Sequence, residues 1–219
     1  MRPQTKTLHY YSSADYLFET IALKRIKVSR ITELNDPYES LGFYRRSEVV
    51  DKKLMAWRKQ TSADYGVICL SEIDWNPAMW AHYADRHRGV CYRFEVSTEP
   101  LMKVDYLEEL QDFEEVKQLS ANEQMHCLLS KKSLEWLYER EYRFFVTLED
   151  AIHEGGNYFE PFSESFMLRE IRLGMSCRLS LEAVRRAAAG AQLNIKVSKT
   201  KMSTTSFRMI EDRALSDRG

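Results

Sequence analysis

The stretch YGVICLSEIDWNPAMWAHYADRHRGVCYRFEV, residues 65–96, decides how this chain folds. It begins with the apolar run Val67–Leu70 and ends with Val90–Val96, where apolar and polar residues alternate as in a half-buried strand. Between them, Asn76 is a favourable N-cap and Pro77 suits the first helical position. We therefore expect a strand, a helix from Pro77 to about His87, and a second strand.

The expected helix has one apolar face, because four of its residues recur at helical spacing. These residues are Met79, Trp80, Tyr83 and Ala84. Ser71 and Glu72 follow the first strand directly, where loops carried by a rigid sheet often present functional groups. A small-molecule site at this strand end is the interpretation that the stretch favours.

Composition narrows the class of protein. The chain has 219 residues and a net charge of −1, so no overall basic charge marks it as a nucleic-acid binder. Its four cysteines are far apart in sequence and are typical of reduced core residues. No apolar run approaches membrane-spanning length, and the N-terminal residues lack a signal-peptide pattern. We expect a soluble, cytoplasmic protein without a membrane partner.

The remaining elements follow from periodicity and capping residues. We expect strands near residues 8–11, 26–31, 102–107, 142–148, 171–173 and 195–197. We expect helices over residues 13–25, 47–60, 108–130 and 180–191, a loop over 151–164, and a frayed tail from about 211. With neither repeats nor a linker, the pattern predicts one α+β domain spanning residues 1–219.

Glu139 and Glu141 are the first candidates for chemistry. They stand two residues apart at the start of a predicted strand, beside Arg140 and Arg143, and would share a face if the strand begins early enough. One carboxylate could stabilise a cationic, sugar-like transition state while the other orients a nucleophile. The alternative is a surface ion-pair cluster, which contributes under about 1 kcal/mol.

A metal site is the second alternative, with His82, Asp85 and Glu72 as ligands of a hydrolase or nuclease. His82 and His87 stand about 140° apart around a helix, so they do not share a face, and we expect no metal. Ser71 lacks the glycine-flanked turn of a nucleophilic serine, and no phosphate-binding glycine loop occurs.

Several motifs, in this order along the chain, resemble a bacterial family known as domain of unknown function 2971. They are LHYYSS (8–13), LNDPYES (34–40), CLSE (69–72), MWAHYADRHRGVC (79–91), WLYEREYR (136–143) and IRLG (171–174). The resemblance spans most of the chain. Leu34 and Leu70 stand where that family has Phe, and His9 where it more often has Tyr.

More remotely, the layout resembles ADP-ribosyltransferases, which bind NAD between two small sheets. That resemblance implies two small, mostly antiparallel sheets with flanking helices in a split-sheet core, and NAD as the substrate. It implies Glu141 as the catalytic glutamate and Glu139 as its helper. The residues assigned to the nucleotide are His9, Tyr11, Asn35, Ser71, Trp80, His82, Tyr83 and Arg143.

The expected partners are a nucleotide-type small molecule and a macromolecular acceptor, either protein or nucleic acid. A toxin or phage-defence effector of this kind would also have an antitoxin or another regulatory partner. The hypothesis from a different class is a non-catalytic ligand- or partner-binding regulatory domain of a bacterial defence system. In that case Glu139, Glu141 and Arg143 are structural.

Overall fold

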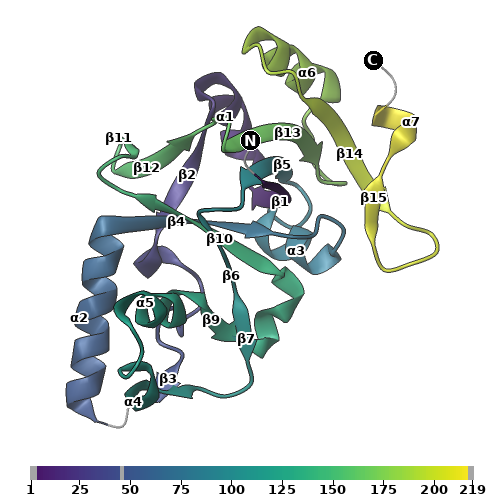
Figure 1. Ribbon diagram of the computed structural model, residues 1–219. Helices are drawn as coiled ribbons and strands as arrows, with labels where there is room; N and C mark the ends of the chain where they lie inside the picture. The colour runs from purple at the N-terminus through teal and green to yellow at the C-terminus, as the bar shows by residue number, and fades with distance from the viewer. Residues whose placement is uncertain (1–3, 45–46, 217–219) are drawn as a thin grey trace. The chain divides into compact units, whose positions relative to one another are not determined.

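The computed structural model describes residues 4–44 and 47–216, and they form an α+β protein (Figure 1). The chain divides into two compact units. The first unit comprises Met1–Ile26, Leu70–Glu99 and Pro161–Gly219, and the second comprises Lys27–Cys69 and Pro100–Glu160. Strands β2 (Arg25–Arg30) and β4 (Tyr65–Ser71) each contribute residues to both units.

Neighbouring strands in the first unit pair mostly antiparallel, with one parallel pair, β13 with β14. In spatial order they are β1 (Thr5–Ser12), β5 (Val90–Ser97), β13 (Phe166–Leu173), β14 (Lys196–Met202) and β15 (Met209–Glu211). The register between β1 and β5 runs from Thr5 opposite Ser97 to Ser12 opposite Val90. Strands β1, β5 and β13 each bury apolar side chains, and Leu8, Phe94 and Ile171 are fully enclosed.

Capping residues predicted the starts of two helices of the first unit, since Asn76 caps α3 and Ser180 caps α6. The helix expected over 13–25 is instead divided: Ser13 caps a short 3-10 helix, and α1 (Leu17–Leu23) follows it without a side-chain cap. The other bounds are Pro77–Tyr83 for α3, Leu181–Gly190 for α6 and Arg213–Ser216 for the terminal α7. Residues 211–216, expected to be frayed, comprise the end of β15 and α7, and residues 217–219 lie outside the described residues.

In the second unit, β4 pairs with β2 and with β10, and β10 pairs with β6. The other strands form a hairpin and two short parallel pairs. The bounds are β6 (Leu101–Lys103), β10 (Glu141–Thr147), β11 (Ile152–Glu154), β12 (Asn157–Pro161), β3 (Phe43–Tyr44) with β8 (Gln111–Asp112), and β7 (Asp105–Leu107) with β9 (Lys131–Ser133).

The helices of the second unit enclose a small apolar cluster. They are α2 (Glu48–Asp64), α4 (Phe113–Val116) and α5 (Ala121–Ser130), with 3-10 turns at Ile31–Glu33 and Leu134–Glu139. The cluster contains Leu41, Phe43, Leu54, Val116 and Leu128. Burying such side chains contributes about 1.5–3 kcal/mol each relative to leaving them in water.

Several expectations were wrong. The strand pairings join eleven strands into one sheet. The strands therefore do not form the two small sheets expected for a split-sheet core. The expected loop at 151–164 contains β11 and β12, because Gly155 and Gly156 both take positive φ and turn a hairpin. The helix expected over 108–130 is interrupted between α4 and α5 by residues 117–120, where Ser120 begins a new capping box.

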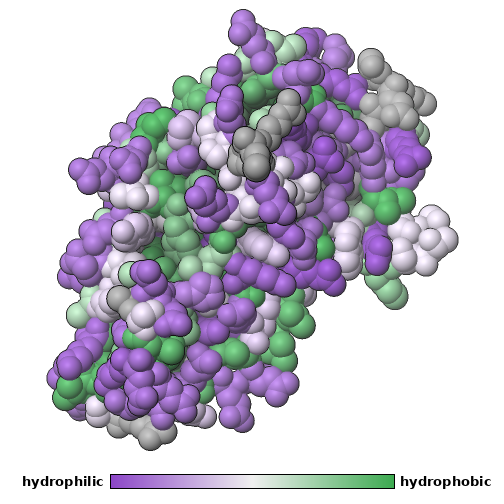
Figure 2. All heavy atoms as spheres, in the orientation of Figure 1, coloured by the Kyte–Doolittle hydropathy of each residue, from purple (hydrophilic) through white to green (hydrophobic). Residues whose placement is uncertain are grey.

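Hydrophilic side chains are interspersed with hydrophobic ones on the face drawn in Figure 2. Within the described residues, no helix combines the length and the apolar composition that crossing a membrane would require. All four cysteines are free thiols, as expected.

Candidate functional site

Glu139 and Glu141 lie in a buried ion cluster in the second unit, which we call the glutamate cluster. The Lys132 ammonium donates to Glu139 Oε2 at 2.5 Å and to Glu141 Oε2 at 2.9 Å. Arg143 Nε donates to Glu141 Oε1 at 2.9 Å, and its Nη1 lies 2.5 Å from Glu39 Oε1. All five residues are at most 7% exposed, so the cluster is not the solvated surface arrangement considered above.

Local backbone structure brings the two glutamates to the same lysine. Ser133 caps the 3-10 helix that ends at Glu139, and Arg140 then takes φ 46° before β10 begins at Glu141. The strand therefore does not begin early enough to hold both glutamates: Glu139 ends the 3-10 helix, and a left-handed residue separates it from β10. Lys132 Nζ also lies 5.0 Å from the centroid of the Trp136 ring, so the ring faces the ammonium charge.

The electrostatics of the glutamate cluster favour the charged forms of Glu141 and Lys132. Burial alone would raise the pKa of Glu141, but Arg143 and Lys132 outweigh it and lower that pKa to about 2. Burial likewise opposes charge on Lys132, yet its two carboxylates raise its pKa. Burial raises the pKa of Glu39, despite Arg143. The charges of Glu139 and Glu141 balance those of Lys132 and Arg143, and Glu39 is the carboxyl that burial drives toward its neutral form.

A small pocket of about 240 Å³ lies beside this cluster. Lys132 lines it, together with Tyr38, Lys131, Ser133 and residues of the turn 107–110. Glu139 and Glu141 are not among its lining residues. Since both oxygens of Glu141 accept hydrogen bonds, a ligand in this pocket would reach Lys132 before either glutamate.

The first-unit candidates lie in a polar row across strands β1, β4 and β13. His9 pairs with Ser71 across the strands, and its Nδ1 lies 3.2 Å from the Ser71 carbonyl oxygen. Its Nε2 lies 3.9 Å from Asp74 Oδ2, and Asp74 in turn pairs closely with Arg172. Burial lowers the pKa of His9, partly offset by Asp74. His9 is therefore a neutral, buried hydrogen-bonding residue at neutral pH.

Tyr11 and Trp80 form part of the first-unit core. The Tyr11 hydroxyl donates to the Ile73 carbonyl at 2.9 Å, and Trp80 Nε1 donates to the Asp74 carbonyl at 2.7 Å. Their rings meet edge to face at 5.3 Å, and Trp80 is fully buried. These two side chains hold the strand end in shape, and neither offers a free face on which a base could stack.

The other assigned residues are more exposed. His82 is exposed and Tyr83 half-buried on α3, and Asn35 is exposed in the second unit. Glu141 and Arg143 belong to the second unit, whereas His9, Ser71 and Tyr83 belong to the first. Among the described residues, no group of three or more histidine, cysteine or acidic side chains is arranged to hold a metal ion, so His82, Asp85 and Glu72 do not form the expected alternative site.

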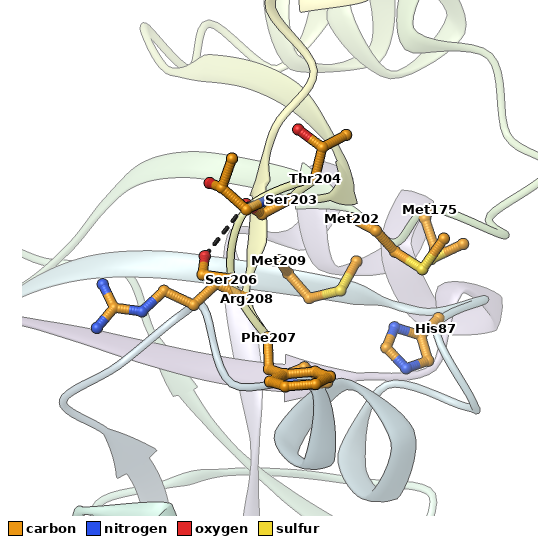
Figure 3. Close-up of a pocket in the computed structure, with 11 residues that line it drawn as sticks. His87, Met175, Met202, Ser203, Thr204, Ser206, Phe207, Arg208 and Met209 are labelled. Carbon is orange, nitrogen blue, oxygen red and sulfur yellow. Dashed lines mark hydrogen bonds between the residues drawn. The ribbon is translucent and has the colours of Figure 1, made fainter.

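A second pocket, which we call the hairpin pocket, lies in the first unit and has a volume of about 620 Å³ (Figure 3). The turn between β14 and β15 forms one wall, and His87, Pro77 and Met175 come from elsewhere in the unit. The complete lining is Pro77, His87, Met175, Met202, Ser203, Thr204, Thr205, Ser206, Phe207, Arg208 and Met209. Apolar walls with a few polar groups are typical of small-molecule sites.

The wall of the hairpin pocket is well ordered by local bonds. The Ser203 N–H donates to the Arg208 carbonyl, and the Ser206 hydroxyl donates to Ser203 Oγ at 3.1 Å (Figure 3). The Arg208 guanidinium stacks 4.3 Å from the Trp75 ring, and the Met209 N–H donates to the Trp75 carbonyl. Phe207, at the turn, is 98% exposed. The turn is thus anchored at its base and offers an apolar edge.

His87 reaches this pocket from a strained backbone. Asp85, Arg86 and His87 take φ values of 42°, 52° and 66°, three consecutive left-handed residues without glycine. Each such residue costs about 1–3 kcal/mol and persists only where surrounding structure determines it. This run ends α3 at Tyr83, shorter than the helix expected to His87.

Two glycines allow the strained run to pack. A Cβ at Gly174 would lie 2.1 Å from the His87 carbonyl oxygen, and a Cβ at Gly89 would lie 2.2 Å from the Ser12 carbonyl oxygen. The Gly174 N–H donates to the Gly89 carbonyl at 2.9 Å. Close backbone approach at these two points fixes the position of His87, whose pKa is lowered by burial.

Comparison with protein-family models, with curated proteins and with solved structures finds no match.

The hairpin pocket was missed by sequence reasoning. Its methionines stand far apart in the chain and have no shared motif, and the segment STTSFR at 203–208 is typical of an ordinary polar turn. The one available signal was the loop ADRHRG at 84–89, which was expected to continue a helix.

Proposed function

We propose that this protein is a ligand-binding domain that holds a small, largely apolar ligand in the hairpin pocket. The observation that carries the proposal is the combination of this pocket with a strained, glycine-supported loop that directs His87 into it. Strain of this kind clusters at binding sites. Three methionines in the lining provide flexible, polarisable contact for ligands of varied shape.

The state of Glu141 supports binding over catalysis. A glutamate that assists bond breaking must approach the reacting atoms, whereas Glu141 is 3% exposed and has both oxygens engaged by cations. In the binding-domain proposal, the glutamate cluster stabilises the second unit. The regulatory or defence role suggested by the sequence would then operate through ligand occupancy.

The test uses methionine-methyl NMR with indole as the apolar probe. The chain has nine methionines, so each methyl signal can be assigned by substitution. We expect saturable shifts at Met175, Met202 and Met209, with Met55 and Met125 of the second unit unchanged. Equal shifts at all five methyls, or no saturation, would contradict a specific site.

An ADP-ribosyltransferase remains the second candidate, and the two glutamates that share Lys132 favour it. A carboxylate released from Lys132 could stabilise the cationic sugar that forms when the nicotinamide bond of NAD breaks. Lys132 lines the adjoining pocket, so its displacement by a ligand would uncover Glu139 and Glu141. The acceptor would be a protein or a nucleic acid, and an antitoxin or regulatory partner would restrain the activity.

NAD consumption distinguishes the two proposals. The transferase proposal expects the purified protein to consume NAD in the presence of cell lysate as a source of acceptors, and expects Glu141→Gln to abolish this while remaining folded. Labelled NAD would then leave its ADP-ribose on one acceptor. If wild type and Glu141→Gln leave NAD equally intact, the transferase candidate is discarded and the binding domain stands.

A further inference from the structure

We propose that His87, Met175 and Met202 bind a soft monovalent metal ion, Cu(I), at one end of the hairpin pocket. This inference rests on the proposed ligand-binding role of that pocket and adds a metal ion at one end of it, beside the space for the apolar ligand. Figure 3 shows Met175 and Met202 on the same side of the pocket as the His87 ring, with Met209 directed to that side.

The donor types select the ion. Thioether sulfur is a soft ligand that favours Cu(I), and a neutral imidazole is compatible with the same metal. His87 Nδ1 is buried and has no hydrogen-bond partner among the described residues. A buried ring nitrogen without a partner is costly unless something binds it, and a metal ion would satisfy it.

Charge balance points the same way. No aspartate or glutamate lines the hairpin pocket, so a divalent ion there would have no anionic ligand. A monovalent ion with neutral ligands leaves only one charge to be stabilised. The cationic side chain of the lining, Arg208, stacks on the Trp75 ring and points away from His87 (Figure 3). Hard ions such as Mg²⁺ prefer carboxylates and carbonyl oxygens, which do not dominate this lining.

Backbone contacts hold two of the ligands close together. Met175 lies between Gly174 and Ser176, and both neighbours meet the His87 backbone. The Ser176 N–H donates to the His87 carbonyl at 3.0 Å, and the α-carbon face of Gly174 packs against the same oxygen. Met202 ends β14, which pairs in parallel with β13, and Met175 follows β13 by two residues. Three donors from distant parts of the sequence thus converge on one end of the pocket.

The test titrates the full chain with Ag(I), a redox-stable substitute for Cu(I), and follows the methionine methyl signals. We expect one ion per chain and shifts at Met175 and Met202. Competition with a chromogenic chelator then gives the Cu(I) affinity without oxygen. Met175→Leu with Met202→Leu should weaken it by about a hundredfold, since even changes outside the ligand set cost about 10- to 100-fold.

Two further variants make the result specific. His87→Asn removes the imidazole but keeps a residue that tolerates positive φ, so it should fold and bind weakly. Met55→Leu, in the second unit, is the control and should bind as wild type does. Affinity unchanged by the double leucine variant would mean binding to cysteine thiols and would overturn the proposal. Indole binding without any Ag(I) binding would also overturn it, while leaving the proposed function intact.

Discussion

Removing the Lys132 charge should strongly destabilise the second unit. In Lys132→Met, the buried carboxylates of Glu139 and Glu141 lose the ammonium that lies 2.5 Å and 2.9 Å from them. Methionine keeps an unbranched chain of similar length but lacks the ammonium, so the variant removes the charge from both carboxylates and from the Trp136 ring. Breaking a buried ion pair from one side costs about 3–5 kcal/mol. For a chain of this size, each kcal/mol lowers the melting temperature by about 2–4 °C, which predicts a fall of about 6–20 °C.

The adjacent lysine supplies a matched control. Lys131 Nζ lies 2.9 Å from Asp105 Oδ2, but the Asp105 side chain is 47% exposed, so Lys131→Met should cost under about 1 kcal/mol. Urea denaturation of both variants, with equal m-values, measures the difference. If the two variants lie within about 1 kcal/mol of each other, the charge on Lys132 does not stabilise the fold and our description of the cluster is wrong.

Three other changes test separate parts of the structure. The pKa of Glu141 is about 2 in the folded chain against about 4.5 in the unfolded chain, so its ionisation contributes about 3 kcal/mol to the free energy of unfolding above pH 4.5. This contribution should be lost as the pH falls toward 2. In acid denaturation, Glu141→Gln should lack this dependence of stability on pH. Gly174→Ala should destabilise by several kcal/mol on urea denaturation because its Cβ meets the His87 carbonyl oxygen, whereas Gly190→Ala, with open space around it, should be neutral. Tyr11→Phe should cost about 1 kcal/mol in the same assay, since it removes the hydrogen bond to the Ile73 carbonyl.

Local signals in the sequence were sufficient for many elements. Alternation predicted β5, Asn76 and Pro77 predicted the start of α3, and Ser180 predicted the start of α6. These signals are short-range, because caps and periodicity act within one or two turns. The end of α3 was not predictable in this way, since the left-handed run at 85–87 depends on Gly174, which is remote in sequence.

Sheet pairing depended on information that periodicity does not contain. The segment 102–107 has the pattern of one strand, but residues on either side of Val104 pair differently, β6 with β10 and β7 with β9. The interruption follows from long-range partners. The expected split sheet was wrong for the same reason, because the pattern of a strand does not say which other strands it pairs with.

In the glutamate cluster, residue types predicted which side chains lie together better than they predicted what those side chains do. The sequence identified Glu139, Glu141 and Arg143 as neighbours, but Lys132 and Glu39 join them only through the fold. Those two residues change the environment of the glutamates. With Lys132 and Arg143 enclosing it, Glu141 is held ionised and out of contact with the adjoining pocket, so its first effect is on stability. The hairpin pocket differs from the glutamate cluster, because the residues proposed to bind its metal ion share no sequence motif. Its specificity would come from a strained loop and two methionines that only folding brings together.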